Sequence, residues 1–176
     1  MITKAEIMTQ PYSGEYKEKI YDIPSSWNSS NWTWVKFVEE DFNEWCGEFR
    51  GSPRAVALSK RHKKILVLTS DYLYQIDCCS GELIEYESQP QYQCLTVTPS
   101  GDFVIADYHD IEKMGITLSD KRLIKSPIQM DTIKFNGWSN NKLLITCDEF
   151  LNWSNHLELE LDGDTFEITI KKYTEK

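Results

Sequence analysis

Alternating and continuous apolar runs divide most of the chain into short strands separated by polar turns. The run 157–161 reads Leu, Glu, Leu, Glu, Leu, which is the period of a strand with one buried face. The runs 65–68, 103–106 and 143–145 are apolar throughout, which is typical of strands buried on both faces. The pattern therefore predicts an all-β protein.

The predicted strands recur in the same order three times, at intervals of about 40 residues. Each unit has an apolar strand, a strongly apolar strand, an alternating strand and a polar last strand, joined mostly by hairpin turns. Pro99–Asp102 and Asp162–Gly163 are two of these turns, because Pro fixes its own φ and Gly accepts a positive φ. We expect antiparallel four-stranded meander units over residues 54–88, 92–128 and 130–172.

The first 50 residues do not repeat this unit. Residues 1–31 have little periodic pattern and contain Pro11, Gly14 and Pro24, so we expect an irregular N-terminal arm. Residues 32–50 predict a hairpin, since aromatic and β-branched residues precede a polar turn and an alternating run. Two interpretations stay open: the N-terminal region completes a fourth sheet, or the array is open and its edges are covered by the arm or another chain.

Length and charge narrow the class of protein. A chain of 176 residues fits a single domain, residues 1–176, and is long enough to bury a real core. It has 28 acidic and 19 basic side chains, a formal net charge of -9. An excess of acids argues against direct nucleic acid binding, which depends on cationic contacts to phosphate. An acidic surface suits a basic partner, and it also simply keeps a protein soluble.

The sequence pattern also suggests a compartment. The N-terminus mixes Lys4, Glu6 and Thr9 among its apolar residues, so no secretory signal is expected. No stretch approaches the about 20 apolar residues of a membrane helix, and we expect no membrane partner. Five cysteines without an export signal indicate free thiols in a reducing compartment. We therefore expect a cytoplasmic protein.

The connections between second and third strands are the candidate functional loops. In a meander they all lie at one end of the sheets, and they include the two longest, residues 107–110 and 148–155. Carboxylates mixed with aromatic side chains suit a protein interface, although solvated loops remain the alternative. The candidate partner-binding residues are Asp71, Asp107, Tyr108, Asp110, Glu112, Asp148, Glu149, Phe150 and Trp153.

No catalytic motif is found in the sequence. His109 lies between Asp107 and Asp110, but the second histidine or cysteine cluster of a metal or acid–base site is missing. Adjacent Cys78 and Cys79 likewise lack a second ligand pair. Neither a nucleophile elbow nor a phosphate-binding glycine loop is present. We expect no catalytic residues, no metal and no cofactor, and thus not an enzyme.

Residues 54–172 resemble the blades of β-propellers. The resemblance is carried by the strand order, the Gly81–Glu82 turn after a third strand and the Pro99–Asp102 turn after a first strand. It implies an incomplete or small β-propeller-like array, because three units and a hairpin are fewer than the four or more blades of closed propellers. It also implies a scaffold whose function lies in its loops.

A small, acidic, all-β protein with an incomplete propeller also resembles the immunity proteins of bacterial toxin–immunity pairs, including contact-dependent growth inhibition systems. This resemblance implies a cytoplasmic, non-enzymatic inhibitor that covers the active site of one cognate protein toxin. That toxin is expected to be a basic nuclease, such as a ribonuclease, since its active site must hold phosphate. The alternative is a propeller-type scaffold or interaction module for another protein partner.

Overall fold

A computed structural model of the chain describes residues 1–175. Its regular elements are all β-strands, arranged in four-stranded sheets. The chain divides into two compact units, residues 1–90 and residues 91 onward, with two sheets in each. Each unit is described by itself below, and the single domain expected from the sequence stays a prediction.

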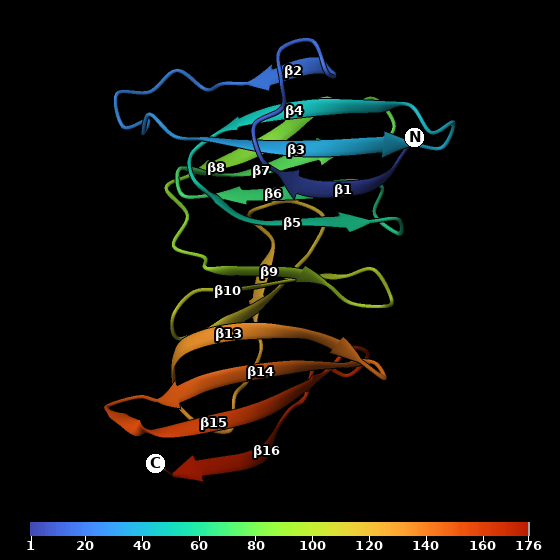
Figure 1. Cartoon of the computed structure of the whole chain (residues 1–176). Helices are drawn as coiled ribbons and strands as arrows, with labels where there is room; N and C mark the ends of the chain where they lie inside the picture. The colour runs from blue at the N-terminus through green and yellow to red at the C-terminus, as the bar shows by residue number, and fades with distance from the viewer. Residues whose placement is uncertain (176) are drawn as a thin grey trace. The chain divides into compact units, whose positions relative to one another are not determined.

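The first unit contains a sheet of order β1-β3-β4-β2 and a sheet of order β5-β6-β7-β8 (Figure 1). The second sheet is an antiparallel meander, as predicted. The strand bounds are β1 Ile2–Met8, β2 Lys17–Tyr21, β3 Trp32–Glu39, β4 Glu44–Arg50, β5 Pro53–Ser59, β6 Lys64–Thr69, β7 Tyr72–Asp77 and β8 Leu83–Ser88.

The expectation of an irregular arm over residues 1–31 is wrong for two segments. Strand β1 pairs antiparallel with β3, and β2 pairs parallel with β4. These strands flank the predicted hairpin 32–50, so the N-terminal region completes a fourth sheet that is not a simple meander. Their sequences carry only a weak local pattern. Both strands are held in place by pairing with strands that lie further along the chain. The Tyr21 hydroxyl, for example, donates to the Gly81 carbonyl oxygen at 2.5 Å.

The second unit consists of two meanders, β9 to β12 and β13 to β16 (Figure 1). Both are antiparallel throughout. The strand bounds are β9 Cys94–Val97, β10 Phe103–Ala106, β11 Ile111–Met114, β12 Lys121–Leu123, β13 Met130–Ser139, β14 Lys142–Glu149, β15 Asn152–Asp162 and β16 Ile168–Glu175.

The prediction of a long loop over residues 148–155 is also wrong. Strands β14 and β15 continue to Glu149 and Asn152, which pair with each other and leave a tight turn at Phe150 and Leu151. Leu151 has a φ of 64°, a conformation that normally selects Gly, Asn or Asp. Because leucine gives no turn signal, the sequence pattern could not predict this hairpin.

A separate apolar core lies between the two sheets of each unit. In the first unit, Phe37, Phe49 and Tyr74 are buried, and the rings of Tyr21 and Phe49 stack with centroids 4.5 Å apart. Gly47 makes room for these rings, since an added Cβ would lie 2.7 Å from an edge carbon of both Phe37 and Phe49. Close packing of this kind leaves little tolerance for extra volume.

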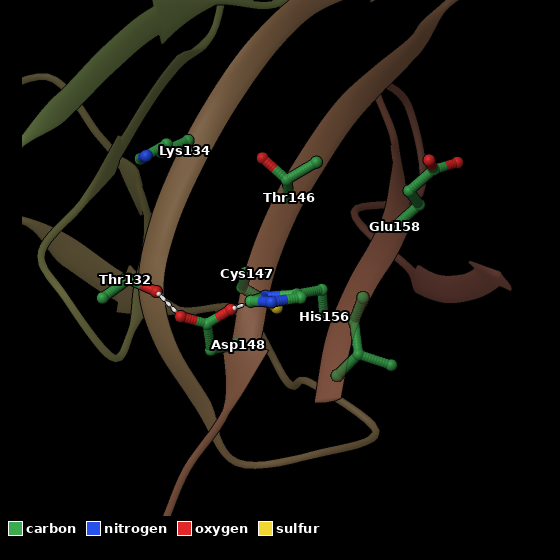
Figure 2. A pocket seen from close by; sticks show the side chains of 8 residues that line it. Thr132, Lys134, Thr146, Cys147, Asp148, His156 and Glu158 are labelled. Atoms are coloured by element: carbon green, nitrogen blue, oxygen red, sulfur yellow. Dashed lines mark hydrogen bonds and ion pairs between the residues drawn. The ribbon is translucent and has the colours of Figure 1, made fainter. Parts of the chain in front are cut away.

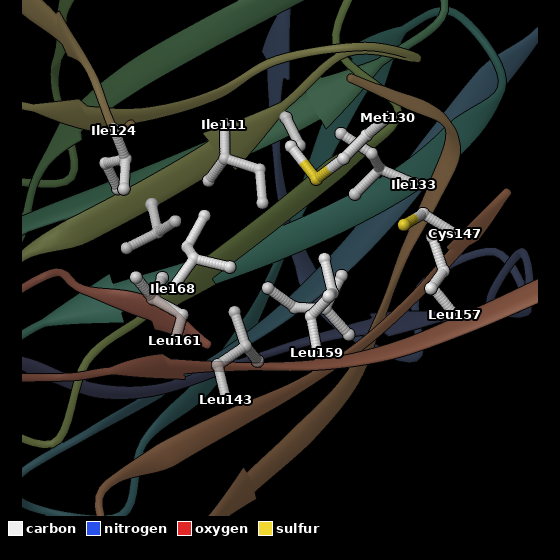
Figure 3. Packing of buried hydrophobic residues seen from close by; sticks show 13 residues of the cluster. Ile111, Ile124, Met130, Ile133, Leu143, Cys147, Leu157, Leu159, Leu161 and Ile168 are labelled. Carbon is white, nitrogen blue, oxygen red and sulfur yellow. The ribbon is translucent and has the colours of Figure 1, made fainter. Parts of the chain in front are cut away.

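Branched aliphatic side chains dominate the core of the second unit (Figure 3). Residues from β10 and β11, such as Val104 and Ile111, pack in one cluster with Leu143, Leu159 and Leu161 from β14 and β15. Strand β10 is fully buried, as its continuous apolar run predicted. Strand β14 instead alternates buried and half-buried positions, which corrects the prediction of burial on both faces. The reason is that the opposite face of this sheet carries the polar pocket described below.

We predict that Tyr21→Phe lowers the free energy of unfolding by about 1 kcal/mol. The substitution removes the buried hydrogen bond to the Gly81 carbonyl while keeping the ring stacked on Phe49. Urea unfolding followed by tryptophan fluorescence measures the change. The matched control is Tyr12→Phe, because Tyr12 is 87% exposed and its hydroxyl has no hydrogen bond in the described chain. Equal stability of the two variants would contradict the role given to β2.

Candidate functional site

The loop between β10 and β11 is a tight turn held by Asp107. One oxygen of its carboxylate accepts hydrogen bonds from the backbone N–H groups of His109 and Asp110, both at 2.7 Å. An aspartate that bonds the backbone two and three residues ahead is the usual stabiliser of such turns. The Tyr108 carbonyl accepts from the Ile133 N–H at 3.4 Å, which ties the loop to β13. Residues 107–110 therefore hold a defined shape.

The hairpin tip between β14 and β15 is fixed in a similar way. One oxygen of Glu149 accepts from the side-chain amides of Asn152 and Asn155, both at 2.9 Å. These donors lower the pKa of the Glu149 carboxyl, since they stabilise its charged form. The Phe150 N–H also donates to the Gln129 carbonyl at 3.0 Å. The hairpin tip is thereby fastened to the chain just before β13.

The rings of Tyr108 and Phe150 lie beside His109, and Trp153 is linked to them through Asp131; we call Tyr108, Phe150 and Trp153 the aromatic cluster. The His109 ring meets Phe150 edge to face at 5.6 Å and lies 6.4 Å from Tyr108. Asp131 connects the cluster, because its two oxygens lie 3.6 Å from His109 Nδ1 and 3.2 Å from Trp153 Nε1. Residues from three separate segments thus converge on one surface of the second unit.

An apolar groove of about 490 Å³ lies beside the aromatic cluster. Its apolar lining comes from the segment that follows β11, together with the Phe150 ring. Polar groups at its margin include His109, Asp110, Lys125 and Gln129. The lining residues are His109, Asp110, Leu123, Ile124, Lys125, Ser126, Ile128, Gln129, Met130 and Phe150.

The structure brings most, but not all, of the predicted partner-binding residues together. Tyr108, Phe150 and Trp153 form the aromatic cluster, and Asp110 lies at the groove. Glu112 lies within β11, opposite Leu123 of β12, and is half-buried. Residues of the loop 107–110 and of the β14–β15 hairpin tip, with Asp131 of β13, therefore account for the surface.

Asp71 belongs to the first unit and has a local role there. Its carboxylate accepts from the Ser29 N–H at 2.7 Å and from the Ser70 hydroxyl at 2.6 Å. Asp71 thus holds the segment before β3 in place, and whether it also contacts a partner stays a prediction. The same holds for Asp107 and Glu149, whose carboxylates stabilise their own loops.

Asp131 and most of the groove lining are not among the residues that the sequence pattern predicts. The sequence pattern predicts the third unit over residues 130–172 and gives Asp131 no role in it. Strand β13 begins at Met130, and Asp131 pairs with Asp148. An isolated aspartate at a strand start gives no signal, so only the register of β13 on β14 identifies it. His109 stands out in the sequence between Asp107 and Asp110, but without a second ligand.

A second, polar pocket of about 350 Å³ lies on the outer face of β13, β14 and β15 (Figure 2). In it, Asp148 accepts from the Thr132 hydroxyl at 2.7 Å and contacts His156 Nδ1 through its other oxygen. Burial acts to raise the pKa of Asp148, but the Thr132 and His156 contacts outweigh it and the pKa is lowered. Lys134, Thr146 and Glu158 complete the polar lining.

Neither pocket holds a metal-binding set of side chains. Among residues 1–175, no group of three or more His, Cys, Asp or Glu side chains is placed to bind a metal ion. In the same part of the chain, no helix is long and apolar enough to cross a membrane.

No protein-family model and no curated protein matches the chain. It is similar to solved structures, among them dihydro-heme d1 dehydrogenase NirN in complex with DHE, with 16% identity and a TM-score of 0.50 over 82% of this chain and 34% of that one. The N-terminal domain of Nup159 matches with 12% identity and a TM-score of 0.48, over 70% and 34%. The WD40 domain of SCAP from fission yeast matches with 11% identity and a TM-score of 0.43, over 80% and 42%.

The match at a TM-score of 0.50 and the four-stranded sheets confirm the predicted all-β, propeller-like fold class. At these identities the likeness concerns the fold alone. The chain spans about a third of the length of the first two structures named, 34% in each case. None of these three is an immunity protein, so the resemblance to that group stays a prediction.

We predict that Asp148→Asn reduces stability at pH 7, and that the difference from the wild type narrows as the pH falls below about 4. A carboxyl whose pKa is lowered by folding stabilises the fold above its unfolded value and loses this contribution as it protonates. Chemical unfolding at several pH values measures the difference. Thr132→Val removes one donor to Asp148 and should give a smaller change. A stability difference between Asp148→Asn and the wild type that is independent of pH would contradict a stabilising role for the charged Asp148 carboxylate.

Proposed function

We propose that this protein is a propeller-type interaction module that binds another protein through the aromatic cluster and apolar groove of its second unit. The observation that carries the proposal is the exposure of the cluster. Tyr108, Phe150 and Trp153 are 51%, 40% and 68% exposed, although each belongs to a loop or hairpin fixed by hydrogen bonds. Exposed aromatic side chains beside an apolar groove are typical of binding surfaces.

The aromatic cluster favours binding through conformational entropy as well as through contact area. Aromatic side chains bury a large area and lose few torsional degrees of freedom on binding. Here part of that loss has already occurred, because Trp153 is hydrogen-bonded to Asp131 and Phe150 packs against His109. A partner would therefore meet rings that are held in place. Preorganisation of this kind raises affinity without adding contacts.

The proposal includes a non-enzymatic role in the cytoplasm. The hydrogen bonds of the loops support the non-enzymatic part of the proposal, because the Asp107 and Glu149 carboxylates, which could serve acid–base chemistry, already accept two hydrogen bonds each from their own loops. Those bonds commit the carboxylates to loop structure. What stays available at the surface is apolar and aromatic area, which suits binding.

A more specific form of the proposal is an immunity protein that inhibits a basic nuclease toxin. Charge supports it, since the chain has a formal net charge of -9. The loop 107–110 and the hairpin tip 148–153 contain the acids Asp107, Asp110, Asp148 and Glu149 and no Lys or Arg. Such a surface would accelerate the capture of a cationic partner at low salt.

We predict that Tyr108→Ala and Trp153→Ala each weaken partner binding by about 10-fold, because exposed aromatic anchors contribute most at interfaces. Crosslinking and affinity capture on the tagged chain identify the partner, and titration of the purified proteins gives the affinity. Trp27→Ala is the matched control, since Trp27 is 79% exposed but belongs to the first unit. A partner whose binding is weakened by Trp27→Ala and not by the two cluster variants would contradict the proposal.

The toxin hypothesis has its own test, which is co-expression with the product of the neighbouring gene. A tight complex is expected whose association rate falls as salt rises, because long-range attraction is screened. Asp110→Asn should reduce the rate at low salt without disturbing the loop, since no hydrogen bond of its carboxylate is present in residues 1–175. A complex whose association rate changes neither with salt nor with Asp110→Asn would reject the charge-based inhibitor and remain compatible with the interaction module.

A further inference from the structure

We propose that the polar pocket on the outer face of β13, β14 and β15 binds a short peptide with free ends, its carboxylate at Lys134 and its ammonium group at Glu158. This site goes beyond the proposed function, because no residue of the aromatic cluster lines the pocket. The volume of the pocket is about 350 Å³, which lies within the range of small-molecule sites.

Three polar side chains cross the pocket in one row. Lys134 of β13 lies opposite Thr146 of β14, and Thr146 lies opposite Glu158 of β15, so all three share one face of the sheet (Figure 2). A cation and an anion therefore stand two strands apart, with a hydroxyl between them. Two strand spacings of about 4.8 Å separate their backbones by roughly 10 Å.

The two charges are not paired with each other or with a neighbour. On the same sheet, Lys142 lies opposite Asp162 and pairs with it at 2.7 Å. Lys134 and Glu158 are both exposed, and neither has a hydrogen bond or ion pair among the side chains that the structure describes. Because Thr146 lies between them, both charges are available to one ligand.

The middle of the pocket offers one donor and one acceptor. The Asn136 side-chain amide donates to the Thr146 hydroxyl oxygen at 3.1 Å, so the hydroxyl proton is left to donate to a ligand. The pKa of Asp148 is lowered, so its carboxylate is charged at neutral pH and can only accept. His156 Nδ1, which contacts it, must therefore carry a proton. In the neutral ring Nε2 is then an acceptor.

The backbone of Thr132 indicates that this side of the pocket is held under strain. Its φ is 52°, in the left-handed region that a β-branched residue rarely adopts. The Thr132 hydroxyl donates to Asp148 at 2.7 Å, and the other Asp148 oxygen contacts His156. Strained residues concentrate at binding sites, where the strain keeps a group in a fixed position. Here that group is the His156 ring.

A ligand of this pocket must carry two opposite charges that lie well apart. An amino acid spans roughly 3.5 Å, which is too short to reach Lys134 and Glu158 together. An extended peptide of two or three residues spans roughly 7 to 10 Å. Its carboxylate can then reach Lys134 and its ammonium group Glu158. A peptide carbonyl can accept from Thr146, and a peptide N–H can donate to His156 Nε2.

Calorimetric titration of the full chain with glycine, diglycine and triglycine tests the proposal. Triglycine should bind about 10-fold more tightly than glycine, because only the longer ligand reaches both charges. Acetylation of its ammonium group, or amidation of its carboxylate, should weaken binding by about the same factor. Equal affinity for the three ligands, no loss on blocking either end, or no binding of triglycine would overturn the proposal.

Variants connect this binding to the pocket. Lys134→Ala should weaken triglycine binding about 10-fold and leave the binding of amidated triglycine unchanged, because both changes remove the same ion pair. Glu158→Gln should act in the same way on triglycine and acetylated triglycine. Lys171→Ala is the matched control, since Lys171 is exposed on the same sheet and pairs with Glu160 at 2.8 Å. Thermal unfolding checks that each variant is folded. Equal effects of Lys134→Ala and Lys171→Ala would reject the site.

The result does not depend on the proposed function. Tyr108→Ala and Trp153→Ala should leave triglycine binding unchanged, because neither side chain lines the pocket. Loss of triglycine binding in both of these variants would assign the peptide to the aromatic cluster and overturn its assignment to the polar pocket.

Discussion

Each sheet of this protein has an apolar face that must be covered, and this requirement shapes everything else. The hairpin of β3 and β4 presents Val35, Phe37 and Phe49, which would be exposed on an isolated pair of strands. Packing this sheet against β5 to β8 removes them from water in a shared cluster. The second unit meets the same requirement with aliphatic side chains of β10, β14 and β15.

The surface we assign to binding follows from this division between core and loop. Strands β14 and β15 carry Leu143, Leu159 and Leu161 into the core, and the same hairpin carries Phe150 and Trp153 to its tip. A rigid base thus presents aromatic side chains to solvent. The acids around them mostly shape the loops. Charge therefore sets the approach of a partner, and the aromatic rings are placed to make the contact.

Local pattern predicted those parts of the fold that local sequence determines. Strands β6 and β10 follow from their apolar runs, and the meanders follow from the spacing of turns. Strands β1 and β2 did not, because their partners lie far along the chain and their own residues alternate poorly. The turn at Leu151 could not be predicted because leucine rarely adopts a positive φ and so gives no turn signal in the sequence. Tyr108 and Trp153 could be predicted as candidates, whereas Asp131 required the register of β13.

The order of strands in the first sheet has a consequence for folding during synthesis. Both its outer strands, β1 and β2, precede the central hairpin in the chain, and Ile2 pairs with Glu39. The β3–β4 hairpin is local and can form quickly, but β1 and β2 have no sheet to join until that hairpin exists. A growing chain must therefore keep its first two strands unpaired while residues 32–50 are made. The hairpin then serves as the template on which the earlier segment is ordered.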